Sequence, residues 1–177
     1  MEVSESLNQE TTNEHIVTSI MKQIRMFLAL KYCKTDNIPA EVIPRIYIGS
    51  IGSAMSKNKL QEIGITHILC VADNISPIFP EDFTYKIIKI LDSPDVNITE
   101  YFQECFEYIN SALANGKILV HCFAGKSRSA SVIIAYLMKF KMWTFDQAYV
   151  HVKQRRPIIE PNPGFVEQLR EYFDRRE

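Results

Sequence analysis

The stretch that decides the fold is KILVHCFAGKSRSASVIIAYLM, Lys117–Met138. Its apolar start is typical of a buried strand. Small and polar residues follow from Cys122 to Arg128, and the residues from about 129 to 139 predict a helix. A strand, a tight loop and a helix in this order direct the first N–H groups of the helix, and the positive end of its dipole, toward the loop. Gly125 permits the curl that turns successive amides inward. The sequence therefore predicts an anion-binding loop with the sulfur of Cys122 at its base.

The residue types in this loop fit nucleophilic phosphoryl transfer. A thiol attacks well only as the thiolate, and the loop amides, the helix N-terminus and Arg128 all favour that form of Cys122. The guanidinium of Arg128 can hold two phosphate oxygens and, with the amides, stabilise the charge of the transition state. His121 is expected to orient the nucleophile rather than to act as an acid, and Ser129 to donate a hydrogen bond that helps the sulfur leave. The residues expected to bind phosphate are Phe123, Ala124, Gly125, Lys126, Ser127 and Arg128.

These residues resemble the signature of a known family. The pattern H-C-x-x-x-x-x-R between a strand and a helix is that of the protein tyrosine phosphatase superfamily, and HCFAGKSRS followed by AYLM resembles the dual-specificity phosphatases. The motif PNPGF, which ends at Phe165, is similar to the family's P-N-x-G-F, and IYIGS, which begins at Ile46, resembles its opening strand. The likeness covers about residues 38–175. It implies a protein tyrosine phosphatase-like fold and an atypical small member, similar to plant MAP kinase phosphatases. The alternative for Cys122, a cysteine of the hydrophobic core, fits poorly with its polar, glycine-containing surroundings.

The resemblance also implies a general acid, which the family supplies from an aspartate ahead of the long helix that precedes the signature strand. Asp92 and Asp95 of LDSPDVNI are the candidates. Asp92 fits the family's spacing to the pair Asn97–Ile98, so we expect it to protonate the leaving group and then to activate water; Asp95 is the second candidate. Both would otherwise be turn aspartates that bond local amides. Asn162 is expected to begin a helix and to brace the phosphate-binding loop.

Apolar strands alternate with helices along the rest of the chain. This order predicts an α/β domain with a central, mostly parallel, twisted sheet of about five strands flanked by helices. Ser53 is expected to cap a helix that ends at Gly64, and Thr144 with Gln147 predicts a capping box. The strands are expected near residues 42–43, 46–48, 66–71, 84–91 and 117–120.

The first 35 residues differ in composition from the remainder. Residues 1–14 are polar and acidic, which predicts a disordered tail. Residues 15–35 carry apolar side chains at helical spacing between basic residues, which predicts an amphipathic basic helical extension, with the catalytic domain at residues 36–177. The helix over residues 15–32 fits a calmodulin-like partner or self-association. The interpretation we prefer is an apolar face that packs on the domain or on another copy of the chain.

The bulk composition excludes several classes of function. The net charge of −1 provides no field for nucleic acid or an anionic membrane, and no apolar run is long enough to span a bilayer. The cysteines Cys33, Cys70, Cys105 and Cys122 form no C-x-x-C pair, so we expect neither a metal site nor a cofactor. Free thiols and the lack of a signal-peptide pattern predict a cytoplasmic or nuclear protein.

Cys70 carries one further expectation, which comes from the resemblance. Some members of the superfamily place a cysteine on a comparable strand, where it forms a reversible disulfide with the active-site thiolate and protects it from irreversible oxidation. The interpretation we prefer for Cys70 is a small buried hydrophobic residue.

The expected substrate is a phosphorylated protein. The chain lacks the long insertions of the larger tyrosine-specific enzymes, which implies a shallow site open to phosphotyrosine, phosphoserine and phosphothreonine, with MAP kinases as a candidate substrate by resemblance. One rival is a phosphoinositide phosphatase, suggested by Lys126, although Phe123 replaces the second lysine of that pattern. The other is a non-catalytic pseudophosphatase, which typically lacks the cysteine or the arginine that are both present here.

Overall fold

A five-stranded sheet with the strand order β1-β2-β5-β3-β4 lies at the centre of the molecule. The computed structural model describes the backbone of residues 2–174 and the side chains of residues 16–172. β1 (Ala40–Ile43) and β2 (Ile46–Gly49) form an antiparallel pair, whereas β3 (Ile65–Val71), β4 (Thr84–Ile88) and β5 (Lys117–His121) run parallel to β2 and to one another. The expected α/β fold with a mostly parallel sheet is confirmed.

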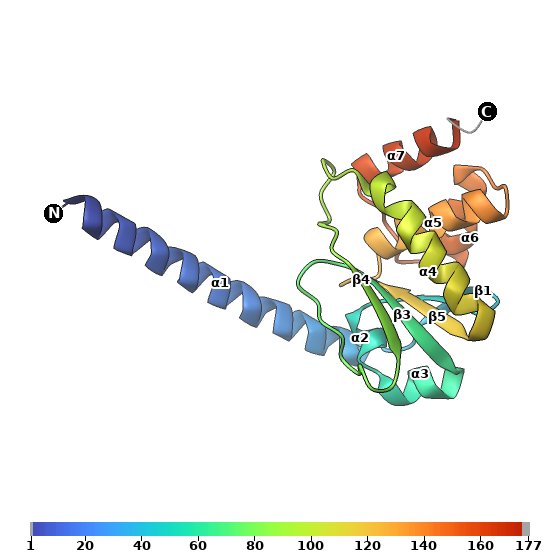
Figure 1. Ribbon diagram of the computed structural model, residues 1–177, viewed down its shortest axis with the longest axis horizontal. Helices are drawn as coiled ribbons and strands as arrows, with labels where there is room; N and C mark the ends of the chain where they lie inside the picture. Colours follow the sequence, from blue (N-terminus) through green and yellow to red (C-terminus); the bar gives the residue numbers. More distant parts are fainter. Residues whose placement is uncertain (1, 175–177) are drawn as a thin grey trace.

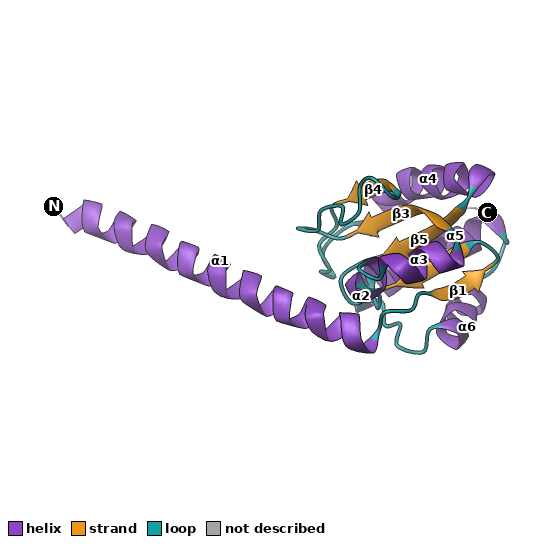
Figure 2. Ribbon diagram, turned by 90° about the horizontal axis from the view of Figure 1, so that it is seen from below, coloured by secondary structure: helices purple, strands orange, loops and turns teal. Residues whose placement is uncertain are grey.

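Helices cover both faces of this sheet (Figure 2). Alternate side chains of a strand point to opposite faces, so Ile118 and Val120 of β5 join one hydrophobic cluster while Leu119 joins the other. The smaller cluster lies under α2 (Ile51–Ala54) and α3 (Lys57–Ile63). The larger one lies under the remaining helices of the domain, which are η1 (Ile98–Tyr101), α4 (Phe102–Asn115), α5 (Arg128–Phe140), α6 (Phe145–Arg155) and α7 (Pro163–Asp174).

The N-terminal extension is a single helix, α1 (Glu2–Thr35), which projects away from the domain (Figure 1). The expectation of a disordered tail over residues 1–14 is therefore wrong for residues 2–14. No proline or glycine interrupts the sequence from Glu2 to Asp36, so once the helix has formed each further residue adds one backbone hydrogen bond at little cost. Acidic composition alone does not oppose this. None of the described helices combines the length and the apolar character needed to cross a bilayer.

In the part of α1 whose side chains are described, the last turns pack on the domain. Leu28, Ala29, Tyr32 and Cys33 are partly buried, whereas the large apolar side chains from Ile16 to Phe27 are exposed. Gly52 at the start of α2 has no space for a side chain because the Tyr32 carbonyl lies against it. The preferred expectation for residues 15–32 was an apolar face that packs on the domain or on another copy of the chain, and packing on the domain is wrong for the apolar residues from Ile16 to Phe27.

Local signals fixed most helix ends as expected. Thr144 and Gln147 form the capping box at the start of α6, and Gly64 adopts the left-handed conformation after α3. The expected cap at Ser53 is wrong. Ser50 accepts the hydrogen bond from the Gly52 N–H and begins α2, because the chain turns into the helix directly after β2.

Candidate active site

The phosphate loop (residues 122–128) lies between β5 and α5, at the carboxyl edge of the parallel strands. Cys122 follows the buried end of β5 and is itself buried. Its Sγ accepts a hydrogen bond from the Gly125 N–H at 3.2 Å, and the Ser129 hydroxyl donates to it at 3.4 Å. Both contacts favour negative charge on the sulfur. The thiol and hydroxyl expected from the sequence are thus together at the base of the loop.

Donors outside the phosphate loop hold its carbonyl groups outward. The Phe123 carbonyl accepts from the Ile51 N–H at 2.9 Å, and the Lys126 carbonyl accepts from the Glu160 N–H at 2.9 Å. In a trans peptide the C=O and the next N–H point in opposite directions. The N–H groups of Ala124 and Ser127 are therefore directed into the loop, where an oxyanion would accept them.

Arg156 holds the two central carbonyls of the loop, a role that sequence reasoning missed. Its Nε donates to the Gly125 carbonyl at 2.8 Å and its Nη2 to the Ala124 carbonyl at 3.2 Å. The same guanidinium donates to both carboxylate oxygens of Asp36, at 3.0 and 2.6 Å, so the loop is tied to the end of α1. The only signal in the sequence was a pair of arginines before Pro157, and nothing there distinguishes the buried Arg156 from the exposed Arg155.

Gly125 makes this arrangement possible. Its φ of 66° lies in the left-handed region, which lets the carbonyl groups of Ala124 and Gly125 both point outward on the same side. A side chain at this position would meet the Gly49 carbonyl and the Arg156 guanidinium. The glycine predicted to curl the loop is therefore required both for its conformation and for its space.

Arg128 is buried at the start of α5, and the hydrogen bonds that hold it use only Nη1 of its guanidinium. Its Nη1 donates to the Ile90 carbonyl at 3.0 Å and to Asp73 Oδ1 at 3.1 Å. Its Nε is buried, lies 3.5 Å from Asp92 Oδ2, and makes no hydrogen bond to any described residue. The Asp92 carboxylate gives this N–H an ion pair but not a hydrogen bond, so the donor is available to an oxyanion that binds in the phosphate loop.

Asp73 was also missed by sequence reasoning. It follows β3, and besides Arg128 it bonds Arg25 of α1 through Oδ2 at 3.3 Å and Asn74 at 2.7 Å. Burial alone would raise the pKa of Asp73, but the Asn74 hydrogen bond and the charges of Arg128 and Arg25 hold that pKa below its usual value. Asp73 is therefore a carboxylate at neutral pH and holds the Arg128 side chain in place.

Of the two candidate acids, the structure places Asp92 at the site. Its Oδ1 accepts from the Ser127 hydroxyl at 2.6 Å and from Asn162 Nδ2 at 2.9 Å. Asp95 is exposed and makes none of these contacts. Asn162 Oδ1 accepts from the Phe165 N–H at 3.0 Å at the start of α7, and the Asn162 N–H donates to the Ser127 hydroxyl at 3.2 Å.

His121 is fully buried beside the nucleophile. Its Nδ1 lies 3.1 Å from the Cys122 carbonyl oxygen. Burial, together with the Arg128 charge, lowers the pKa of His121 to about 4. The imidazole is therefore neutral near pH 7, which fits an orienting residue and not a proton donor.

Cys70 lies directly beside the site on the neighbouring strand. It pairs in register with His121 across β3 and β5 and is buried. Burial, and then the nearby Cys122, raise the pKa of Cys70 to about 12, so it is a thiol near neutral pH. All four cysteines are free.

Known proteins are similar to this chain in sequence and in fold. The family model described as dual specificity phosphatase, catalytic domain, matches residues 46–175. Dual specificity protein phosphatase 1 of Arabidopsis thaliana is 40% identical over 92% of this chain and 82% of its own. MAP kinase phosphatase with leucine-rich repeats protein 3 of Dictyostelium discoideum is 41% identical over 85% of this chain but only 17% of its own.

A solved structure supports the same assignment. The human tyrosine phosphatase-like serine/threonine/tyrosine-interacting protein superposes with a TM-score of 0.76 at 39% identity, over 79% of this chain and 98% of its own. The family match covers most of the chain and includes the whole phosphate loop. The chain therefore belongs to the dual specificity phosphatase family.

Proposed function

We propose that this protein phosphatase hydrolyses phosphotyrosine, phosphoserine and phosphothreonine in proteins through a cysteinyl-phosphate intermediate. The observation that carries the proposal is the set of donors directed at one place: the N–H groups of Ala124 and Ser127, which point into the phosphate loop, and the buried Nε of Arg128, which makes no hydrogen bond. Together they provide a binding site for the three charged oxygens of a phosphoryl group.

In the first step the Cys122 thiolate forms a bond to phosphorus as the bond from phosphorus to the substrate oxygen breaks. Asp92 gives its proton to that departing oxygen. The Asp92 carboxyl is held beside the loop by Ser127 and Asn162, so it lies next to the reacting group. The products of this step are the dephosphorylated protein and phosphocysteine.

In the second step water replaces the sulfur on phosphorus. The Asp92 carboxylate takes one proton from the water as the new P–O bond forms and the S–P bond breaks. The Ser129 hydroxyl, which donates to Sγ, stabilises the departing thiolate. Inorganic phosphate leaves, and Asp92 is again protonated for the next cycle.

The test is turnover of p-nitrophenyl phosphate and of a phosphotyrosine and a phosphothreonine peptide. We expect Cys122→Ser to abolish turnover of all three while phosphopeptide binding persists. Cys105→Ser is the matched control, because Cys105 is equally buried but lies in α4, outside the site. Turnover by the Cys122→Ser variant at the parental rate would refute the assigned nucleophile.

MAP kinases are the substrate class we propose first. The support is the name of the Dictyostelium relative, of which this chain spans a small part. The Cys122→Ser variant, used as a trap on a panel of phosphorylated proteins, should retain phosphorylated MAP kinase more than its unphosphorylated form. Equal retention of the two forms would contradict the assignment.

The two rivals gain no support from the site. Lys126 is the residue that suggested a phosphoinositide substrate, but its Nζ forms an ion pair with the Glu160 carboxylate at 3.9 Å. A non-catalytic role gains no support because Cys122 and Arg128 are both present.

We also propose that exposed apolar residues of α1 can bind a calmodulin-like partner or a second copy of the chain. The support is the exposure of Ile16, Val17, Ile20 and Phe27 on the projecting helix. A pull-down with and without calcium, and sedimentation of the purified protein, separate these partners.

A further inference from the structure

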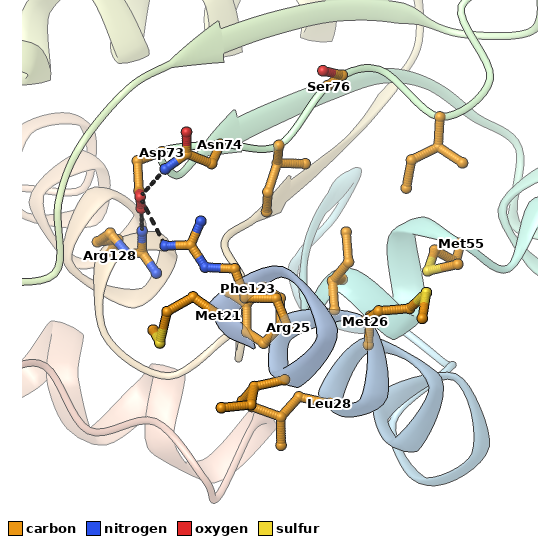
Figure 3. A pocket seen from close by; sticks show the side chains of 15 residues that line it. Met21, Arg25, Met26, Leu28, Met55, Asp73, Asn74, Ser76, Phe123 and Arg128 are labelled. Atoms are coloured by element: carbon orange, nitrogen blue, oxygen red, sulfur yellow. Dashed lines mark hydrogen bonds and ion pairs between the residues drawn. The ribbon is translucent and has the colours of Figure 1, made fainter. Parts of the chain in front are cut away.

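A cleft of about 570 Å³ opens between α1 and the segment that follows β3, directly beside the phosphate loop (Figure 3). Its walls are mostly apolar, although it reaches Arg128 at one end. This volume is in the range of sites that hold small organic groups. The apolar side chains that line it include Met21, Ile24, Leu28, Ile75, Ile78 and Phe123.

One carboxylate joins the α1 wall to the active site. Asp73 Oδ1 accepts from Arg128 at 3.1 Å, and Asp73 Oδ2 pairs with Arg25 of α1 at 3.3 Å, as Figure 3 shows. Closer to the C-terminal end of α1, the Tyr32 ring packs edge-to-face on the Phe123 ring, with the ring centroids 5.9 Å apart. The position of the α1 wall is therefore fixed relative to the residues that surround the phosphate.

We propose that this cleft is a substrate subsite that takes a large apolar side chain next to the phosphorylated residue, an inference that rests on the proposed phosphatase function. A phosphoryl group above Cys122 anchors the substrate chain at the end of the cleft where Arg128 lies. Neighbouring residues of a chain are about 3.8 Å apart, so a residue flanking the anchored one reaches the cleft without a long span. Because Phe123 and Arg128 of the phosphate loop also line the cleft, the occupant that fits this place is the substrate itself.

The charges in the cleft agree with an apolar occupant. Arg25 and Asp73 neutralise each other, and Asp73 is further engaged by Arg128 and Asn74. What remains for a ligand is the apolar surface of α1 and the facing loops. Ile24, at 47% exposure, contributes surface that a substrate side chain would cover.

The test compares two phosphotyrosine peptides that differ only in the two residues flanking the phosphotyrosine, leucine in one and serine in the other. We expect the full-length protein to favour the leucine peptide by about tenfold in kcat/KM, the size of discrimination that an open apolar pocket gives. Ile24→Ser should bring this ratio close to one. The matched control is Ile20→Ser, one helical turn away at 50% exposure and outside the cleft, which should leave the ratio unchanged.

The outcomes separate this inference from the function on which it rests. Failure of the parent protein to hydrolyse p-nitrophenyl phosphate overturns the proposed function. Turnover of p-nitrophenyl phosphate with equal kcat/KM for the two peptides overturns the subsite alone. An equal loss of preference in Ile20→Ser and Ile24→Ser also overturns it, and would indicate that α1 acts as a surface for another copy of the chain.

Discussion

Replacing Arg156 with lysine should weaken catalysis although the residue never touches substrate. The guanidinium donates hydrogen bonds to two loop carbonyls and to both oxygens of Asp36. A lysine ammonium is a compact charge that can keep the ion pair with Asp36 but cannot also reach the two carbonyls. Each buried carbonyl left without its donor costs about 1–3 kcal/mol. We therefore expect the free energy of unfolding to fall by about 2–6 kcal/mol.

The effect on activity follows from the loop geometry. Without its outward anchor the peptide between Ala124 and Gly125 can rotate, which removes the Gly125 N–H from the sulfur at 3.2 Å. A hydrogen bond to a charged group contributes about 1.5–3 kcal/mol, so kcat/KM for p-nitrophenyl phosphate should fall at least about tenfold.

The assay pairs catalysis with oxyanion binding. Vanadate inhibition should weaken in parallel with kcat/KM, because the same loop amides bind vanadate and the phosphoryl group of the substrate. Arg155→Lys is the same change at the exposed neighbour and should alter neither quantity. Urea unfolding of each variant gives the stability. If Arg156→Lys lowered stability but left kcat/KM and vanadate affinity within twofold of the parent, the positioning role would be refuted.

Three further predictions concern the acid, the buried histidine and the second cysteine. Asp92→Asn should lower kcat by about 10²- to 10⁴-fold on a phosphoserine peptide, with a smaller loss on p-nitrophenyl phosphate, whose leaving group needs less protonation; Asp95→Asn should retain parental kcat on both. The pKa of His121 is about 4 in the folded chain against an ordinary 6.5, so the unfolded chain binds the proton first as pH falls. Protonation of His121 should therefore lower the free energy of unfolding by about 3 kcal/mol as the pH falls from 6.5 to 4, with no effect above pH 6.5. Urea unfolding of His121→Gln should lack this part of the pH dependence. An equal pH dependence in the two proteins would contradict the assignment. Hydrogen peroxide should oxidise Cys122 to the sulfenic acid, which the Cys70 thiol then attacks to give a disulfide and water; peptide mass mapping that finds no Cys70–Cys122 disulfide would end this idea.

The parts of the fold predicted from sequence are those coded by contiguous residues. The buried strand ending at His121, the glycine of the loop and the capping box at Thr144 all depend on neighbours within a few positions. The length of α1 was underestimated because polar composition was given more weight than the absence of helix-breaking residues. Ser50 was missed as a cap because the end of β2 could not be placed to within a residue.

The supporting residues of the site could not be predicted, because they depend on long-range placement. Arg156 is far along the chain from all three of its acceptor residues, and only the packing of α1 against the phosphate loop brings Asp36 to it. Asp73 looked like any turn residue after a strand. The resemblance selected Asp92 over Asp95 by spacing, and in the structure it is Asp92 that accepts hydrogen bonds from Ser127 and Asn162.

The central claim is that phosphate passes through the sulfur of Cys122. The most direct measurement is mass spectrometry of the Asp92→Asn variant quenched in acid during turnover of p-nitrophenyl phosphate, where loss of the water-activating carboxylate should let the intermediate accumulate. A phosphoryl group on the Cys122 peptide is the expected result. Hydrolysis that proceeds with phosphate on another residue, or with no phosphoenzyme at any time point, would contradict the account.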